Sequence, residues 1–192
     1  MTPRYGPILI TFSPPLGVGE LPKNGGWRTG SVRRVLLRDL TTADLDAMTT
    51  INAANVPAVG ENTREDLAEI LDMSVIALGT EVDGALAGFC LVVPPGQPYW
   101  STNYEWFSAR YDDFVYLDRV AFAAEHQGRG LGSEMYAEVE RRASAPWFLL
   151  EVNLRPRNEG SLRFHARHGF VEVGQQETNY GSLVSLLAKP LG

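Results

Sequence analysis

The sequence has few of the residues that form disulfides and metal clusters. It holds one cysteine, Cys90, and three histidines in 192 residues. One cysteine excludes an internal disulfide and a cysteine-based zinc cluster, and histidines scattered this widely indicate no metal site. Because Cys90 lies in the apolar run ALAGFCLVV, we expect a buried thiol rather than a nucleophile.

Long apolar runs and an excess of positive charge are also missing. No window approaches the ~18 apolar residues that cross a bilayer, and the N-terminal run ILITF is shorter than the apolar centre of a signal peptide. The formal net charge of −6 disfavours a general nucleic-acid-binding surface. We therefore expect a soluble, cytoplasmic protein that binds neither nucleic acid nor membranes.

Residues 1–30 differ in composition from the rest of the chain. Glycine and proline make up 11 of these 30 residues, against 31 of 192 overall. Such a stretch supports little regular structure, so we expect a flexible N-terminal extension at 1–30 and one domain at 31–192. The alternative is an upstream start codon, with the domain beginning near Ser31.

After this extension the hydrophobic period alternates between that of strands and that of helices. Strands are expected at 31–40, 114–122, 147–154, 170–176 and 182–189, with a hairpin at 74–93 that turns at Asp83-Gly84. Helices are expected at 41–56, 62–71, 130–143 and 159–168. The order β-α-α-β-β-β-α-β-α-β-β predicts a single α/β (α+β) domain, in which helices flank a mixed central sheet.

Three glycines open one of these helices, in the stretch AEHQGRGLGSEMYAEVERR at 124–142. The first N–H groups of a helix lack intrahelical partners, and the macrodipole places positive charge there. Glycine lets the backbone approach an anion closely, and Arg129 adds a cation. The stretch therefore predicts a phosphate or pyrophosphate site, although a tight turn without a ligand is the alternative.

The spacing of the glycines excludes two common phosphate loops. A P-loop needs Lys-Ser or Lys-Thr after its last glycine, and a Rossmann fingerprint needs its third glycine at position 133, where this chain has Ser133. What remains is Q-x-x-G-x-G at 127–132. This string resembles the coenzyme A pyrophosphate loop of the GNAT superfamily of N-acetyltransferases.

Further motifs carry the same resemblance. NEGSLRFHARHGF at 158–170 is similar to the second GNAT motif, with His165 where the family usually has Tyr. LDRVAF and LLEVN match the strands around the loop, and the order of elements fits from about residue 32 to 188. The resemblance implies a GNAT fold and acetyl-CoA as co-substrate, without a metal.

The resemblance also implies which residues hold coenzyme A. Backbone N–H groups of the loop would bind the pyrophosphate, and a strand would bind the pantetheine arm. The residues are Val120, Ala121 and Phe122 of the strand, Gln127, Gly128, Arg129, Gly130, Leu131, Gly132 and Ser133 of the loop, and Asn158. Asn158 could also be a plain helix N-cap, and the two roles can coexist.

The catalytic residues are implied in the same way. Glu151 matches the general base of ribosomal-protein N-terminal acetyltransferases, and its apolar strand favours a raised pKa; a structural carboxylate is the alternative. Asp118 is its rival, and it should not pair with Arg119 because neighbours on a strand face opposite sides. His165 would protonate the leaving thiolate as an imidazolium, or else pack as a core residue. His126 and His168 are assigned no role.

The acceptor side is indicated by composition alone. The segment 94–116 holds eight aromatic residues and several carboxylates, which suit an amine with an apolar body. Packing or a homodimer interface is the alternative. The candidates for contacting the acceptor are Tyr99, Trp100, Tyr104 and Trp106.

Together these features predict transfer of an acetyl group to a primary amine, which could be a small molecule, an amino acid or a peptide N-terminus. Transfer would be direct, in a ternary complex, because Cys90 is unsuited to carry an acyl group. The alternative is a non-catalytic acyl-CoA-binding sensor or assembly module of GNAT fold.

Overall fold

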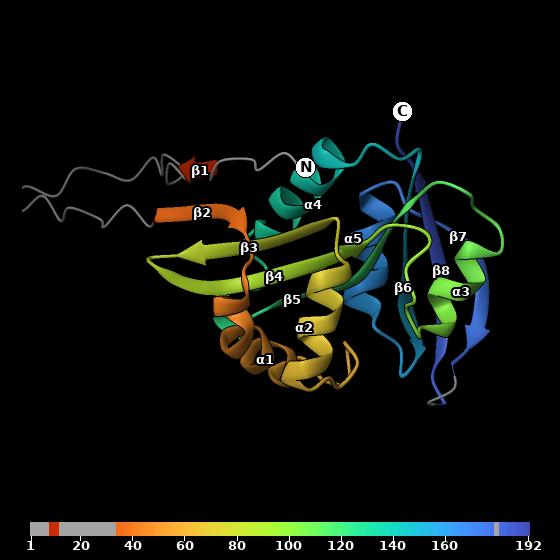
Figure 1. Cartoon of the computed structure of the whole chain (residues 1–192), viewed down its shortest axis with the longest axis horizontal. Helices are drawn as coiled ribbons and strands as arrows, with labels where there is room; N and C mark the ends of the chain where they lie inside the picture. The colour runs from red at the N-terminus through yellow and green to blue at the C-terminus, as the bar shows by residue number, and fades with distance from the viewer. Residues whose placement is uncertain (1–7, 12–33, 179–180) are drawn as a thin grey trace, which may run out of the picture.

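The computed structural model describes residues 8–11, 34–178 and 181–192. These residues form a single α/β domain around one sheet of eight strands (Figure 1). The strands are β1 (Ile8–Thr11), β2 (Arg34–Asp39), β3 (Ile76–Val82), β4 (Ala85–Val93), β5 (Val115–Phe122), β6 (Trp147–Arg155), β7 (Val171–Glu177) and β8 (Leu183–Pro190). Their order in the sheet is β1-β2-β3-β4-β5-β6-β8-β7.

Helices cover both faces of this sheet. They are α1 (Leu45–Ala54), α2 (Arg64–Met73), α3 (Thr102–Ser108), α4 (Leu131–Arg142) and α5 (Glu159–Arg167), with 3-10 turns η1 (Thr42–Asp44) and η2 (Ala124–His126). Every strand pair is antiparallel among the described residues except β5 with β6. The sheet is therefore mixed, as the sequence predicts. No described helix has the length and apolar character needed to cross a bilayer.

Two elements were not expected from the sequence. The expected extension at 1–30 lies outside the described residues except for β1, which pairs antiparallel with β2. The aromatic segment 94–116 contains α3, whose first N–H groups are capped by the Ser101 side chain. With β1 and α3 set aside, the observed elements follow the expected sequence of strands and helices.

The two faces of the sheet bury separate sets of side chains. Figure 1 shows α1 and α2 in front of the sheet and α4 and α5 behind it. Side chains of α1, α2 and α3 pack with Tyr116 and Leu149, whereas those of α4 pack with Leu117 and Leu150. Because side chains alternate along a strand, Glu151 shares the α1–α2 face with Leu149.

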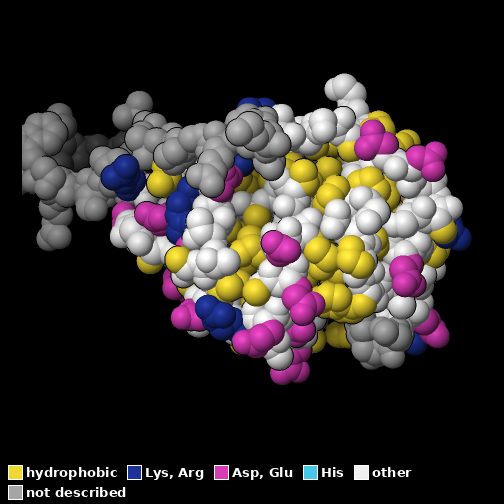
Figure 2. All heavy atoms as spheres, in the orientation of Figure 1, with side chains coloured by type: hydrophobic (Ala, Val, Ile, Leu, Met, Phe, Trp, Pro, Cys, Tyr) yellow, Lys and Arg dark blue, Asp and Glu magenta, His cyan; other side chains and the backbone are white. Residues whose placement is uncertain are grey.

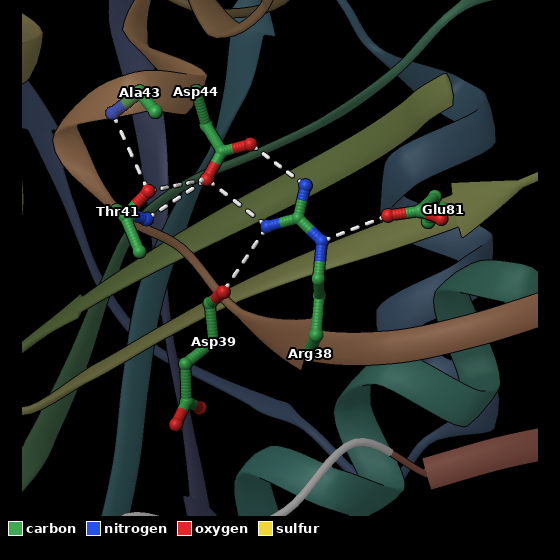
Figure 3. A network of polar contacts seen from close by, with 6 residues as sticks. All are labelled: Arg38, Asp39, Thr41, Ala43, Asp44 and Glu81. Carbon is green, nitrogen blue, oxygen red and sulfur yellow. Dashed lines mark hydrogen bonds and ion pairs between the residues drawn. The ribbon is translucent and has the colours of Figure 1, made fainter. Parts of the chain in front are cut away.

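A polar network fixes the start of α1 against the sheet (Figure 3). The Arg38 guanidinium donates two hydrogen bonds to the Asp44 carboxylate, at 2.7 and 3.0 Å, and one to Glu81 at 2.9 Å. Asp44 also closes a capping box with Thr41. Since Arg38 lies on β2 and Glu81 on β3, these contacts join the first helix to two strands.

Candidate active site

A slot opens between β5 and β6, the parallel pair. These strands pair only at Val115–Phe148 and Tyr116–Leu149, although they are eight and nine residues long. Beyond these two pairs they separate, and a cleft of about 730 Å³ lies between and around them. Its walls include 117–122 of β5 together with Leu150, Glu151 and Asn153 of β6.

The pairing of β5 with β4 decides which backbone groups face the slot. The N–H of Ala123 donates to the carbonyl of Ala87 at 2.9 Å, so this is a hydrogen-bonded position of the antiparallel ladder. Such positions alternate along a strand. Ala121, opposite Phe89, therefore bonds to β4, whereas the backbone groups of Val120 and Phe122 point towards the slot. The Phe122 carbonyl is consistent with this direction, because it accepts hydrogen bonds from the Asn55 and Gln127 side chains rather than from β4.

The N-terminus of α4 opens into the same cleft. Helices α2, α3 and α5 begin with a side-chain cap, whereas the N-cap residue of α4 is Gly130, which has no side chain to make one. Gly128 and Gly130 have φ of +68° and +84°, values that a side chain disfavours. The unpaired N–H groups and the helix dipole make this end a suitable site for an anion.

The side chains of the loop have other roles than binding an anion. The Gln127 amide donates to Phe122 and Asn55, which ties the loop to the end of β5. Arg129 is exposed and does not line the cleft. The Ser133 hydroxyl lies 3.0 Å from Nε2 of His168. An anion here would therefore be bound by the backbone, with Leu131, Gly132 and Ser133 lining the cleft.

Asn158 has the capping role that was considered for it. Its side chain accepts from the N–H of Ser161 at 3.1 Å, as the N-cap of α5. It also lines the cleft, so the capping role places the residue where coenzyme A is expected.

Glu151 lies on β6 at the edge of the slot. The Tyr116 hydroxyl donates to its Oε2 at 2.7 Å. Burial raises the pKa of Glu151 to about 7; the hydrogen bond from Tyr116 opposes this shift, and the negative charge of Asp118 adds to it. A carboxylate with this pKa can accept a proton near neutral pH.

Asp118 and Arg119 do form an ion pair, contrary to the expectation from strand alternation. Nε of Arg119 lies 2.5 Å from Oδ2 of Asp118, and both side chains are buried. The cause is a β-bulge: Leu91 pairs with Arg119 and Val92 with Leu117, which leaves Asp118 without a partner on β4. A bulge breaks the alternation of side chains. Asp118 also accepts from the Tyr99 hydroxyl, so both of its oxygens are engaged.

This ion pair continues into the α1–α2 connection. Nη1 of Arg119 donates to the Asn52 side chain at 2.8 Å, and Asn52 donates to the carbonyl of Gly60 at 3.0 Å. Asn52 and Arg119 are both buried. A chain of hydrogen bonds thus connects β5 with residues 55–61, which line the cleft on the same face as Glu151.

His165 lines the cleft, but its ring is neutral. The Ser161 carbonyl oxygen lies 2.8 Å from Nδ1, which must therefore carry the proton. Nε2 then accepts from the Tyr136 hydroxyl at 2.8 Å. Burial lowers the pKa of His165 to about 4. The expected role as an imidazolium acid therefore requires a second proton that the ring lacks at neutral pH.

The four aromatic candidates for acceptor binding lie outside the described cleft lining. Tyr99 and Tyr104 are buried; Tyr99 bonds Asp118, and Tyr104 bonds the carbonyl of Pro94. Trp106 packs over Gly174, where an added Cβ would meet its ring at 2.8 Å. Trp100 is half exposed. Tyr99 therefore reaches the site indirectly, through Asp118 and through its ring contact with Tyr116. The packing alternative fits Tyr104 and Trp106.

The connection between α1 and α2 also lines the cleft. The loop 55–61 crosses the slot: Asn55 donates to the Phe122 carbonyl, and Asn153 donates to the Pro57 carbonyl at 3.1 Å. Tyr136 and His126 are also lining residues. The Nδ1 atom of His126 is buried and has no partner among the described residues.

A family model agrees with this geometry. Residues 45–170 match the model of the acetyltransferase (GNAT) family. This match covers more than half of the chain. The chain belongs to the GNAT family of acetyltransferases.

Solved structures share the GNAT fold with this chain. They include Ard1 from Thermoplasma volcanium (TM-score 0.68, 14% identity, covering 82% of this chain and 98% of that one). The ribosomal-protein-S18-alanine N-acetyltransferase from Escherichia coli and YncA, a putative acetyltransferase from Salmonella typhimurium with its cofactor acetyl-CoA, each give TM-score 0.62, 18% identity and coverage of 82% and 94%. No curated protein sequence matches the chain.

Acetyltransferases of the GNAT family use acetyl-CoA as the acyl donor, and the residues around the slot fit this ligand. The uncapped end of α4 suits its pyrophosphate, and the slot-facing backbone of β5 suits its extended arm. Cys90 is fully buried, and burial raises the pKa of its thiol to about 12. Within the described ranges, no group of three or more acidic, His or Cys side chains could hold a metal.

Proposed function

We propose that the protein is an N-acetyltransferase that moves the acetyl group of acetyl-CoA to a primary amine held on the α1–α2 face. One observation carries the proposal. Glu151, with a pKa of about 7, lies at the edge of the same slot into which the uncapped N-terminus of α4 opens. Acetyl-CoA, when bound, supplies an activated thioester.

The backbone would hold and polarise this donor. The N–H groups at the start of α4 would bind the pyrophosphate, and the slot-facing groups of Val120 and Phe122 would bind the arm. The N–H of Val120 would donate to the thioester carbonyl oxygen, where negative charge develops during attack.

Glu151 would activate the acceptor. An alkylammonium ion has a pKa near ~10 and must lose a proton before its nitrogen can attack. Glu151 would take that proton, while Tyr116 keeps the carboxylate oriented. Transfer would be direct, in a ternary complex, because a buried thiol with a raised pKa such as Cys90 is a poor acyl carrier.

The leaving sulfur needs no strong acid, since an ordinary thiol has a pKa of about 8.5. The thiolate can take the second proton, which the nitrogen loses as the C–S bond breaks and the amide forms. We therefore propose that His165 holds the Tyr136 hydroxyl in the cleft wall rather than protonating the thiolate. We also propose that the reaction takes place in the cytoplasm, where acetyl-CoA is made and used.

Two measurements test this function. Calorimetry should show acetyl-CoA binding well below millimolar concentration, and a thiol-release assay should show turnover with at least one primary amine in a broad panel. If acetyl-CoA does not bind, the proposal fails. Tight binding without turnover of any amine would instead support the sensor alternative.

A further inference from the structure

The excess negative charge of the chain is confined to one segment. Residues 41–73 hold seven of the 23 acidic residues but one of the 17 basic residues, Arg64. Sixteen of each remain in the rest of the chain, which is therefore neutral overall. The formal net charge of −6 thus belongs entirely to this segment.

Part of this acidic segment, residues 55–61 with Glu61, lines the cleft. The whole segment comprises η1, α1, the loop 55–61 and α2. Figure 2 shows Asp and Glu side chains gathered over the part of the surface where Figure 1 places α1 and α2. A concentration of one sign of charge beside a cleft draws in ligands of the opposite sign. The segment therefore favours a cationic acceptor.

The cleft offers no cation to an acidic acceptor on this side. Its described lining contains two arginines and no lysine. Arg119 is buried and already bonds Asp118 and Asn52. Arg167 belongs to α5, on the opposite face of the sheet. A carboxylate beside the reacting nitrogen would therefore meet Glu61 and Glu151 without a counter-ion.

The rim of this side is apolar. Residues 56–59 of the loop read Val-Pro-Ala-Val, and Val56 is 41% exposed. An apolar substituent of the acceptor could cover this rim. Charge at Glu61 and Glu151, together with an apolar rim, suits an ammonium group attached to an apolar body.

From these observations we infer the class of the acceptor. It is a primary amine that carries an apolar body and no anionic group beside its nitrogen, as in an alkylamine or a peptide N-terminus, rather than a free amino acid. The inference rests on the proposed function and narrows it.

Three matched acceptors test it: isoamylamine, L-leucinamide and L-leucine share one side chain and differ at the carboxyl position. We expect kcat/KM at least ten-fold higher for isoamylamine and for leucinamide than for leucine. Isoamylamine has a higher amine pKa than leucine, so a preference for it cannot come from a larger neutral fraction. Leucine used as well as isoamylamine would overturn the inference. A tripeptide amide with N-terminal leucine distinguishes an alkylamine acceptor from a peptide N-terminus. Its kcat/KM should exceed that of leucinamide only if the natural acceptor is a peptide.

Two matched variants locate the effect. Glu61→Arg places a cation at the cleft and should lower the isoamylamine-to-leucine ratio at least three-fold. Asp113→Arg makes the same charge change at an exposed position outside segment 41–73 and the cleft, and should leave the ratio unchanged. An equal change in both variants would show an effect of net charge alone and overturn the inference.

Failure of the proposed function can be distinguished from failure of this acceptor class. Calorimetry on the complex with coenzyme A measures acceptor binding without turnover. If none of the amines is acetylated, the proposed function fails, and the binding order still decides the acceptor class. Tighter binding of leucine than of isoamylamine would overturn the class in that case too.

Discussion

The two sides of the slot are built from different parts of the chain. The donor side presents backbone: the uncapped end of α4 and the slot-facing groups of Val120 and Phe122. The acceptor side presents side chains, with Glu151, Asp118, Arg119 and Asn52 joined to their neighbours by hydrogen bonds. A backbone site recognises one ligand through its phosphates, whereas side chains can change with the acceptor. In the proposed function, the donor side would bind the co-substrate that the family shares, and the acceptor side would determine which amine this member selects.

The largest effect should come from removing the proposed base, Glu151, on the acceptor side. Glu151→Gln keeps the size of the side chain and can still accept from Tyr116, but it cannot take a proton. We expect kcat to fall by ~10²–10⁴, with the Kd for acetyl-CoA unchanged. Steady-state kinetics and calorimetry measure the two quantities separately. If the activity of the variant stays within a few-fold of the parent, another group is the base.

The corresponding substitution on the donor side is at Gly130. Its φ is +84°, and an added Cβ there meets nothing within 4 Å. Gly130→Asn and Gly130→Asp impose similar backbone strain, but only Asp places a negative charge at the anion site. We expect the Kd for acetyl-CoA to rise at least ten-fold more in the Asp variant, as measured by calorimetry. Equal affinities in the two variants would contradict anion binding at this end of α4.

A smaller effect should follow from breaking the hydrogen bonds that connect the Asp118–Arg119 ion pair with the loop 55–61. Asn52→Asp keeps an acceptor for Arg119 but loses the donor to the Gly60 carbonyl. We expect the KM for the amine to rise up to about ten-fold, since the lost hydrogen bond contributes ~0.5–1.5 kcal/mol to holding the loop in place. The Kd for acetyl-CoA should not change. A lower thermal midpoint with an unchanged KM would show that the link is only structural.

The contrast between the two sides also explains which parts of the site could be predicted. Gly128 and Gly130 were identifiable because a backbone site requires glycine at set positions. Glu151 was identified through its resemblance to the general base of ribosomal-protein N-terminal acetyltransferases, and its apolar strand favoured a raised pKa. The Asp118–Arg119 pair was not, because it depends on a bulge set by the register of β5 against β4. The contacts of the loop 55–61 with Phe122 and Asn153 join residues 67 and 96 positions apart, and no local pattern records them.

The same limit applies to the fold. The hydrophobic periods located most elements of the sheet and its helices, since each buries one face of its own sequence. They did not locate α3, which lies within the aromatic segment. Its buried face depends on contacts with distant residues, such as Trp106 over Gly174 of β7. Packing against another part of the chain, rather than local spacing, defines this helix.

The smallest effect should appear as a shift in pH dependence. The Tyr116 hydroxyl donates to Glu151 and so favours its ionised form, which lowers a pKa that burial raises. A base must be deprotonated, so kcat/KM of the parent should rise with pH and level off above about 7. Tyr116→Phe removes the donor and raises the pKa of Glu151, which moves this inflection to higher pH. Activity should then fall a few-fold on the acid side of the inflection and little at pH ~9, where Glu151 is ionised in both the parent and the variant. A uniform loss across the pH range would mean that Tyr116 acts by packing and not on the protonation of Glu151.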